Sequence, residues 1–305
     1  MKKILTGIMT LALTTSLFAK KGIDIGSGGE GGNYYTVASD MVEYCGKDIQ
    51  DKYGYEVKNI ASHGSVDNLN GILNKKYSIG FVQEDVLNYF KKKDQLNTIE
   101  LNTKRLMYLY PEYLTILIPK GWHPKSNGGF FSRLKFWDKP QNKPISIMSL
   151  KGQTVYAQGG ALVSAQALSY FMGLKLNIQD ASKGHVSGPF IFVTGSGDQR
   201  IQKMLASGKW FLLSFNGNEL ANRAAFYKPS QVTYIVNGKT ITAKTVSIMS
   251  LVLERNYRSK KRKEALKALK MCVKSNIDDL VDDGESNKWS LIQKINGWNG
   301  GGDDE

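Results

Sequence analysis

After its first nineteen residues, the chain lacks any apolar run of the about 18 residues that a membrane-spanning helix requires. Histidine is scarce, and His63, His123 and His185 lie far apart in segments that resemble loops. The sequence has no His-Glu-x-x-His, no Cys–His zinc spacing and no Gly-x-Ser-x-Gly. We therefore expect no metal ion, no cofactor and no catalytic residue, and a binding protein rather than an enzyme.

Cysteine is also scarce, because Cys45 and Cys272 are the only two. In an oxidising compartment such a pair can form a disulfide. The bond would close a loop of more than two hundred residues, for which chain entropy predicts about 5 kcal/mol of stabilisation. The alternative is two buried thiols that never meet, and the sequence leaves both alternatives open.

Acidic residues are too few to balance the basic ones, since 27 Asp and Glu stand against 41 Lys and Arg. The resulting net charge of +14 first suggests nucleic acid as a partner, but an exported protein does not meet nucleic acid. The densest basic run is Arg255–Lys270. We interpret it as a solvated helix face, and the alternatives are attraction to an anionic membrane surface or steering of an anionic ligand.

The N-terminal segment predicts export. Lys2 and Lys3 precede an apolar stretch, Ile4–Phe18, and the small residue Ala19 can end a cleaved segment. This order is typical of a secretory signal peptide. No cysteine lies near the expected cut, so we predict a periplasmic protein without a lipid anchor.

Two stretches show the alternation of strands and helices that is typical of α/β sheets. The first opens with Gly22–Ile25 as a strand and the second with Thr154–Ala157, and a glycine turn and a helix follow each strand. Between them, Arg105–Pro119 predicts two strands with a turn near Pro111, suited to crossing between lobes. The predicted divisions are a signal peptide (1–19), lobe I (20–115), lobe II (116–225) with an insertion at about 121–148, a return to lobe I (226–298) and a disordered tail (299–305).

The first glycine turn has the Gly-x-Gly-x-x-Gly spacing of dinucleotide enzymes over Gly26–Gly31. The acidic residue expected about 20 positions later should close the second strand. Here Asp51 comes before that strand, so the nucleotide interpretation fails. A loop of small residues before a helix that begins at Asn33, its predicted N-cap, still exposes backbone N–H groups that attract anions.

Three motifs in register carry a family resemblance: GSGGEGGNYY at Gly26–Tyr35, GSVDN at Gly64–Asn68 and IGFVQED at Ile79–Asp85. In order and spacing they resemble the TAXI family of TRAP-transporter solute receptors. The resemblance extends more weakly over most of the remaining chain. It implies a two-lobed periplasmic-binding-protein fold, type II-like, in which each lobe is a mixed α/β sheet flanked by helices and hinge strands join the lobes.

The resemblance also implies a ligand and a partner. The ligand would be a small acidic solute of the amino acid or oxoacid class, and the partner a TRAP-type membrane permease, with the receptor itself a monomer. Carried onto this sequence, the ligand-binding residues would be Gly28, Gly29, Gly32, Asn33, Tyr34, Ser65 and Gln83 in lobe I, with Gly159 and Gly160 in lobe II.

The chain departs from the family pattern at positions that bear on the ligand. Glu30 and Glu84 add carboxylates beside the expected anion pocket, and Gln158–Ala161 lacks the hydroxyl groups of the usual second-lobe turn, with Ser164 one helical turn later. Arg223 and Lys183 are loose candidates for a cation in the cleft.

Two other functions share these features. One is a periplasmic ligand-sensing subunit that reports its closed state to a membrane kinase. The other is a basic envelope-binding protein that uses Arg255–Lys270 and keeps only a vestigial cleft. Loss of surface binding in salt would indicate the last of these.

Overall fold

The fold is described from a computed structural model, which covers residues 22–124 and 144–298. The predicted signal peptide, the predicted disordered tail and residues 125–143 of the predicted insertion lie outside the described residues. Within them, no helix combines the length and the apolar character needed to cross a bilayer.

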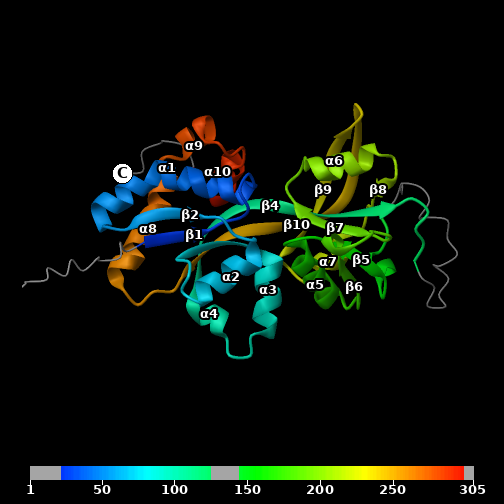
Figure 1. The fold of residues 1–305 in the computed structure, drawn as a ribbon, viewed down its shortest axis with the longest axis horizontal. Helices are drawn as coiled ribbons and strands as arrows, with labels where there is room; N and C mark the ends of the chain where they lie inside the picture. Colours follow the sequence, from blue (N-terminus) through cyan, green and yellow to red (C-terminus); the bar gives the residue numbers. More distant parts are fainter. Residues whose placement is uncertain (1–21, 125–143, 299–305) are drawn as a thin grey trace, which may run out of the picture.

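The first lobe is built on strands in the order β2-β1-β3-β10-β4, of which β1, β2 and β3 run parallel and β10 runs antiparallel to β3 (Figure 1). The strands are β1 (Gly22–Gly26), β2 (Glu56–Ile60), β3 (Ile79–Gln83), β4 (Thr103–Pro119) and β10 (Lys239–Arg255). The helices are α1 (Asn33–Tyr53), α2 (Ser65–Leu73), α3 (Glu84–Lys93), α4 (Thr98–Asn102), α8 (Lys260–Ser275), α9 (Ile277–Asp283) and α10 (Trp289–Asn296).

Helices cover both faces of this sheet. One core joins α1, α8, α9 and α10 to the sheet, with Trp289 fully buried in it. A second core joins α2, α3 and α4 to the opposite face, around Leu69 and Tyr77. The strand residues Ile23, Ile25 and Phe81 are buried because a sheet covered on both sides has no solvated face.

The second lobe repeats the same strand order, as β6-β5-β7-β4-β8. Its elements are β5 (Thr154–Ala157), α5 (Ala161–Met172), β6 (Asn177–Asp180), β7 (Phe190–Thr194), α6 (Gln199–Ala206), β8 (Trp210–Leu212), α7 (Gly217–Ala221) and β9 (Tyr227–Val236), with short 3-10 helices η3 (Ile147–Leu150) and η4 (Ala181–Lys183). In each lobe three parallel strands are followed by an antiparallel strand that has crossed from the other lobe. This is the predicted two-lobed periplasmic-binding-protein fold, each lobe a mixed sheet flanked by helices.

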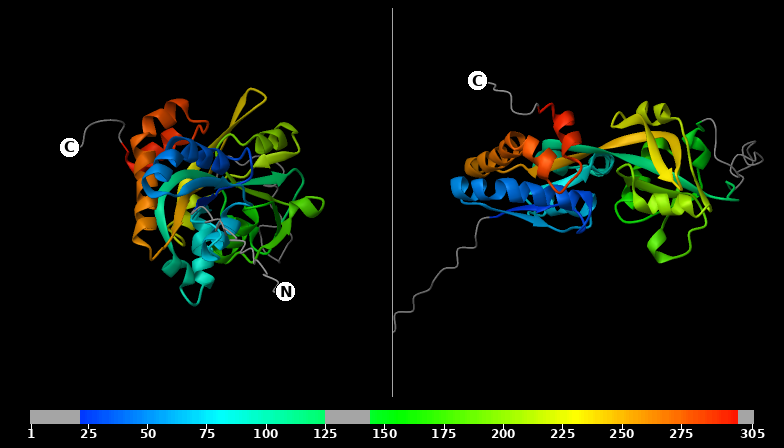
Figure 2. Two further views of the ribbon diagram at one scale, coloured as in Figure 1. Left: turned by 60° about the vertical axis from the view of Figure 1, so that its left-hand side comes forward. Right: turned by 90° about the horizontal axis from the view of Figure 1, so that it is seen from above.

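Two long strands, β4 and β10, cross between the lobes and pair with each other along the way (Figure 2). The predicted turn near Pro111 is wrong, because β4 continues through Pro111, which lies opposite Met249 beside a register shift in β10. A proline lacks the N–H of a regular ladder, and an irregular position in the sheet accommodates it.

The structure also differs from the predicted return to lobe I at residue 226. Tyr227–Ile248 pair with each other or pack in the cores of lobe II, where Tyr227 and Val246 are buried with Leu220. The chain re-enters lobe I only near Met249 and Ser250 of β10, beside the shift in register. The hairpin of β9 and β10 therefore extends lobe II, and its turn is at Asn237–Gly238, as predicted.

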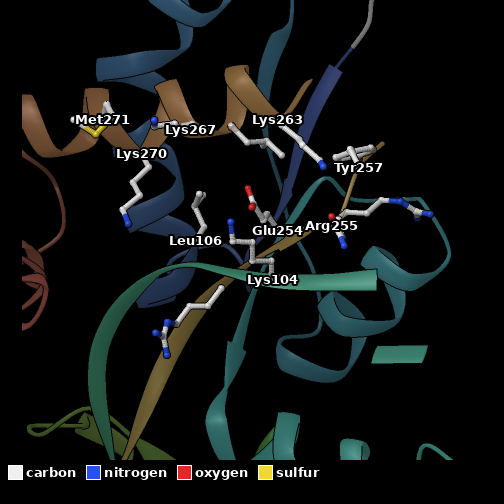
Figure 3. Close-up of a pocket in the computed structure, with 12 residues that line it drawn as sticks. Lys104, Leu106, Glu254, Arg255, Tyr257, Lys263, Lys267, Lys270 and Met271 are labelled. Atoms are coloured by element: carbon white, nitrogen blue, oxygen red, sulfur yellow. The ribbon is translucent and has the colours of Figure 1, made fainter. Parts of the chain in front are cut away.

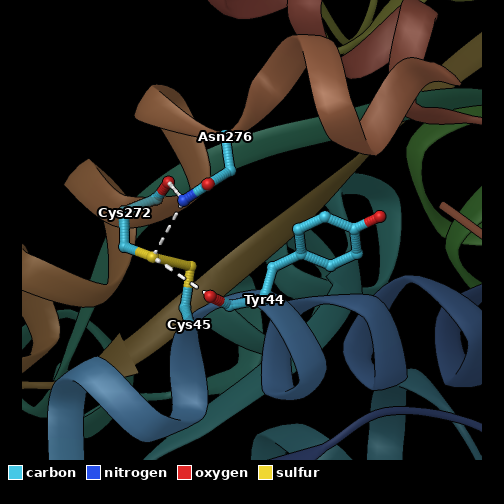
Figure 4. Close-up of a disulfide and its surroundings, with 4 residues drawn as sticks. All are labelled: Tyr44, Cys45, Cys272 and Asn276. Carbon is cyan, nitrogen blue, oxygen red and sulfur yellow. Dashed lines mark hydrogen bonds between the residues drawn. A yellow bond between two sulfur atoms is a disulfide. The ribbon is translucent and has the colours of Figure 1, made fainter. Parts of the chain in front are cut away.

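Cys45 and Cys272 form a disulfide in the structure, which joins α1 to α8 (Figure 4). Cys45 belongs to the buried face of α1, where Val37, Ala38 and Met41 pack on the sheet. Residues far apart in the sequence thus meet because both helices cover the same face of lobe I. The bond fixes α8 against α1 on the side of lobe I away from lobe II (Figure 1).

Candidate ligand-binding cleft

The glycine loop between β1 and α1 lies where the two lobes face each other. Gly28 is buried, and a Cβ added to it would lie 3.1 Å from the Cβ of Tyr34, while Gly29, Gly32 and Asn33 are exposed. Gly32, not the predicted Asn33, is the N-cap of α1, and Asn33 is its first helical residue. The positive end of this long helix dipole lies next to lobe II, where a Cβ added to Gly195 would be 3.7 Å from Asn33 Nδ2.

Ser65 and Gln83 are buried beside this loop. The Ser65 hydroxyl accepts a hydrogen bond of 3.0 Å from the backbone N–H of Gln83. This bond ties the start of α2 to the end of β3, so Ser65 helps to position Gln83. The side chain of Gln83 then reaches away from lobe I toward the crossing strands.

Glu112 on β4 is the centre of a buried hydrogen-bond cluster. Its Oε2 accepts from Gln83 Nε2 at 2.5 Å and from Ser250 Oγ at 3.2 Å. The Tyr34 hydroxyl donates to Ser250 Oγ at 2.8 Å and lies 3.3 Å from Glu112 Oε2. Because Ser250 lies at the register shift of β10, the two crossing strands and the first lobe meet in one cluster.

The Glu112 carboxyl has an unusual proton affinity. It is only 8% exposed, and burial raises its pKa from 4.5 to about 7, against the lowering effect of the hydrogen bonds from Gln83, Ser250 and Tyr34. The nearby charge of Asp85 raises it further. The group can thus change its charge near neutral pH.

Asp85, at the start of α3, is a second buried carboxyl. Burial raises its pKa from 3.8 to about 6, although the Ser164 hydroxyl and the N–H of Val86 stabilise the ionised form. Its Oδ1 accepts from Val86 N at 2.8 Å, and its Oδ2 has no partner among the described residues.

Ser164 brings lobe II into the cluster. It is fully buried on α5, and its hydroxyl donates to Gln83 Oε1 at 3.3 Å. Gln83 therefore contacts Glu112 of a crossing strand and Ser164 of the second lobe with the two ends of one amide. The lobes already touch at this point, as α3 and α5 do.

Lys288 supplies a cation at the edge of the cluster. It is half-buried, and burial lowers its pKa while the charge of Glu112 raises it. A Cβ added to Gly195, in the loop after β7, would lie 3.7 Å from both Lys288 Nζ and Asn33 Nδ2. The α1 N-terminus, the Lys288 loop and a loop of lobe II therefore converge.

The Lys288 loop is held by a buried carboxylate of α1. Asp40 accepts hydrogen bonds from the N–H groups of Glu285 at 3.1 Å and Ser286 at 3.0 Å, and from Trp289 Nε1 at 2.6 Å. These three bonds fix the segment that precedes α10 over the start of α1, and so fix the backbone that carries Lys288.

The remaining predicted residues lie at the rim or elsewhere. Gly159 and Gly160 form the turn before α5, where Gly159 has the positive φ of 58° that favours glycine. Glu30 is exposed, and Glu84 is half-buried, so burial raises the pKa of Glu84 although the charges of Arg105 and Lys228 lower it. The two loose candidates for a cation are elsewhere on lobe II: Arg223 donates to the carbonyl of Met172, and Lys183 lies 3.9 Å from Asp180.

Sequence reasoning missed Glu112, Asp85, Ser250 and Lys288. The signal for Glu112 was present, as a single carboxylate in an otherwise apolar crossing segment. The sequence carries no such signal for Lys288, because the position of Lys288 depends on how the C-terminal segment folds back over α1. Among the described residues no three His, Cys, Asp or Glu side chains come together as a metal-binding group.

Solved structures similar to the chain include the aliphatic sulphonate binding protein SsuA of Escherichia coli (14% identity, 92% of this chain and 80% of that chain, TM-score 0.46). A second is the alkanesulfonate-binding protein SsuA of Xanthomonas axonopodis pv. citri, with 13% identity, coverage of 91% of this chain and 80% of that chain, and a TM-score of 0.42. A third is the CA3427 gene product of Candida albicans, with 10% identity, coverage of 90% of this chain and 80% of that chain, and a TM-score of 0.45.

No curated protein matches the sequence. The sequence profile of the NMT1-like family matches residues 25–250, which is most of the chain. The chain belongs to the NMT1-like family.

Proposed function

We propose that this protein is an extracytoplasmic solute-binding receptor that captures a small carboxylate-bearing solute by closure of its lobes. The observation that carries the proposal is the polar cluster at the crossing strands. There Gln83 of lobe I hydrogen-bonds both Glu112 of the crossing strand β4 and Ser164 of lobe II. A solute that replaces or adds to these contacts would favour the closed arrangement over an open one.

The solute carboxylate would lie at the start of α1. The glycine loop leaves residues 29–33 exposed at the positive end of a 21-residue helix. The backbone N–H of Gly32 donates to the carbonyl of Gly29, so the proposal relies on the other N–H groups of this loop. Lys288, beside Asn33, adds a positive charge to the same end of the cleft. Glu30 is exposed, so its carboxylate can turn to solvent and need not oppose the anion.

The other end of the solute would meet Glu112. Glu112 Oε2 already accepts from protein groups, whereas its Oε1 accepts no hydrogen bond from the described residues. An ammonium group could donate to this oxygen and would keep Glu112 ionised, whereas an oxoacid offers no such donor. Within the predicted amino acid or oxoacid class, the cleft therefore favours an amino acid.

Delivery to a TRAP-type permease in the periplasm is part of the proposal. Its support is the resemblance carried by Gly26–Tyr35, Gly64–Asn68 and Ile79–Asp85, together with the predicted signal peptide. No nucleic acid partner is proposed, and the receptor would act as a monomer.

Calorimetry with matched pairs of ligands tests the proposal. The mature chain, unfolded and refolded to remove bound solute, is titrated with amino acids and with the oxoacids of the same carbon skeleton. We expect an amino acid to bind, and Glu112→Gln to weaken that binding at least tenfold while Glu100→Gln, at an exposed position of α4, leaves it unchanged. The proposal fails if no small carboxylate binds, and the amino acid preference fails if an oxoacid binds more tightly to the wild type.

A further inference from the structure

A hollow lies on lobe I, away from the Glu112 cluster, where the start of β4, the end of β10 and the side of α8 meet (Figure 3). It encloses about 430 Å³. We call it the lysine pocket, after Lys104 of β4 and Lys263, Lys267 and Lys270 of α8. Lys104 precedes Glu112 by eight residues of a strand, which places the pocket about 25 Å from the cleft cluster.

The lysines of this pocket make no close ion pair within the described parts of the chain. None of the four makes an ion pair within 4.0 Å there, whereas the neighbouring Lys260 does pair with Glu264. Glu254 is the one carboxylate among the residues that line the pocket, so it balances the four lysine charges only in part. The remaining like charges repel one another, and an anionic partner relieves that repulsion. The pocket is therefore suited to negative charge.

One carboxylate limits which anion can enter. Glu254 lies between Lys104 and the lysines of α8, half-buried at the centre of the pocket (Figure 3). The charges of Lys104, Lys270 and Lys263 act on it, but none comes close enough to pair. A compact anion placed at the centre would meet Glu254 and be repelled. Negative groups are favoured only at the rim, beside the lysines.

The spacing of the rim lysines indicates an extended partner. Lys263 and Lys267 are separated by four residues of a helix, or about 6 Å along its axis. Alternate side chains of an extended peptide are about 6.6 Å apart. Apolar surface from Leu106 and the 45% exposed Met271 lies between or beside the lysines. A backbone N–H of such a peptide could donate to Glu254.

From these contacts we propose that the lysine pocket docks an extended acidic peptide segment of a partner protein, with carboxylates at the rim and apolar side chains against Leu106 and Met271. The pocket is preformed, because the disulfide at Cys272 and the buried side chains of Leu266 and Leu269 hold α8 in place. This docking does not depend on which solute the cleft binds, or on whether it binds one.

Fluorescence anisotropy tests the proposal with a fluorescein-labelled peptide of alternating glutamate and leucine. The mature chain should bind this peptide, and a peptide of alternating lysine and leucine should not bind. The double variant Lys263→Glu/Lys267→Glu should weaken binding at least tenfold. The matched control Lys261→Glu/Lys274→Glu changes the net charge equally at exposed positions of α8 outside the pocket, and it should bind within about threefold of the wild type.

Two further probes separate the other sources of negative charge. Pyrophosphate should bind the wild type more weakly than the peptide does, and Glu254→Gln should strengthen pyrophosphate binding at least tenfold. Tighter wild-type binding of pyrophosphate than of the peptide would overturn the proposal in favour of a compact-anion site. Binding to phosphatidylglycerol vesicles that depends on Lys263 and Lys267, without peptide binding, would overturn the proposal in favour of a membrane surface. Equal losses of peptide affinity in the two double variants would also overturn it, because the peptide would then be attracted only by the overall positive charge of α8.

Discussion

At the scale of single residues, Glu112 couples the stability of the protein to pH. Its pKa of about 7 in the folded protein lies above the 4.5 of a free glutamate, so the native state holds a proton that the unfolded chain releases. Stability therefore falls as pH rises from about 4.5 to 7 and is level above that range. The loss is at most about 3 kcal/mol, since each tenfold change in proton affinity is about 1.4 kcal/mol.

Removing this proton should flatten the pH profile. In Glu112→Gln the difference in unfolding free energy between pH 5 and pH 8, measured by urea titration, should shrink, and part of the remaining slope belongs to Asp85, whose pKa is also raised. Glu100→Gln should keep the wild-type slope because that residue is exposed. Equal slopes in all three proteins would show that Glu112 titrates normally.

Asp40 is a residue whose effect should be structural first. Its carboxylate accepts from the N–H groups of Glu285 and Ser286 and from the indole of Trp289, all near the core of lobe I. Asp40→Ala leaves these donors unsatisfied and should lower the unfolding free energy by about 3 kcal/mol. Asp48→Ala, later in α1 at an exposed position, should cost less than about 1 kcal/mol in the same titration. A similar small cost in both variants would contradict this role of Asp40.

At the scale of elements, local pattern predicted most of lobe I and the start of lobe II. The helix at Asn33 and the strand Thr154–Ala157 begin where the glycine turn and the strand pattern placed them, although Gly32 and not Asn33 is the N-cap of the helix. The strand β4 was divided at Pro111 because local rules treat proline as a break, whereas pairing with both β10 and β7 carries the strand through. The hydrogen-bond cluster around Glu112 was not predicted, because Glu112 and Ser250 are brought together only by the register of strands far apart in sequence.

The disulfide between α1 and α8 should be a major support of lobe I. It links residues 227 positions apart, and removal of such a bond typically costs about 2–5 kcal/mol. The double variant Cys45→Ala/Cys272→Ala should melt at a lower temperature than the oxidised wild type. Reductant should lower the melting temperature of the wild type toward that of the variant and leave the variant unchanged. An unchanged wild-type melting temperature in reductant would contradict this support.

At the scale of the whole molecule, the crossing strands β4 and β10 join the lobes, and among the described residues α3 and α5 are also in contact. Paired strands can twist without breaking their pairing, so the lobes can rotate about the positions near Glu112 and Met249, beside the register shift of β10. Ser164 limits how far they close, since it is fully buried against Gln83 in the opposite lobe.

A bulky side chain at this contact should hold the lobes apart. In Ser164→Tyr the larger side chain cannot fit against Gln83, so small-angle X-ray scattering should give a larger radius of gyration than for the wild type. Gln166→Tyr, exposed on the same helix, is the control and should scatter like the wild type. With a bound solute, the wild type and the control should share one compact radius while Ser164→Tyr stays expanded and binds at least tenfold more weakly. If Ser164→Tyr instead reaches the compact radius and keeps wild-type affinity, closure does not pass through this contact, and the solute must lie away from Gln83.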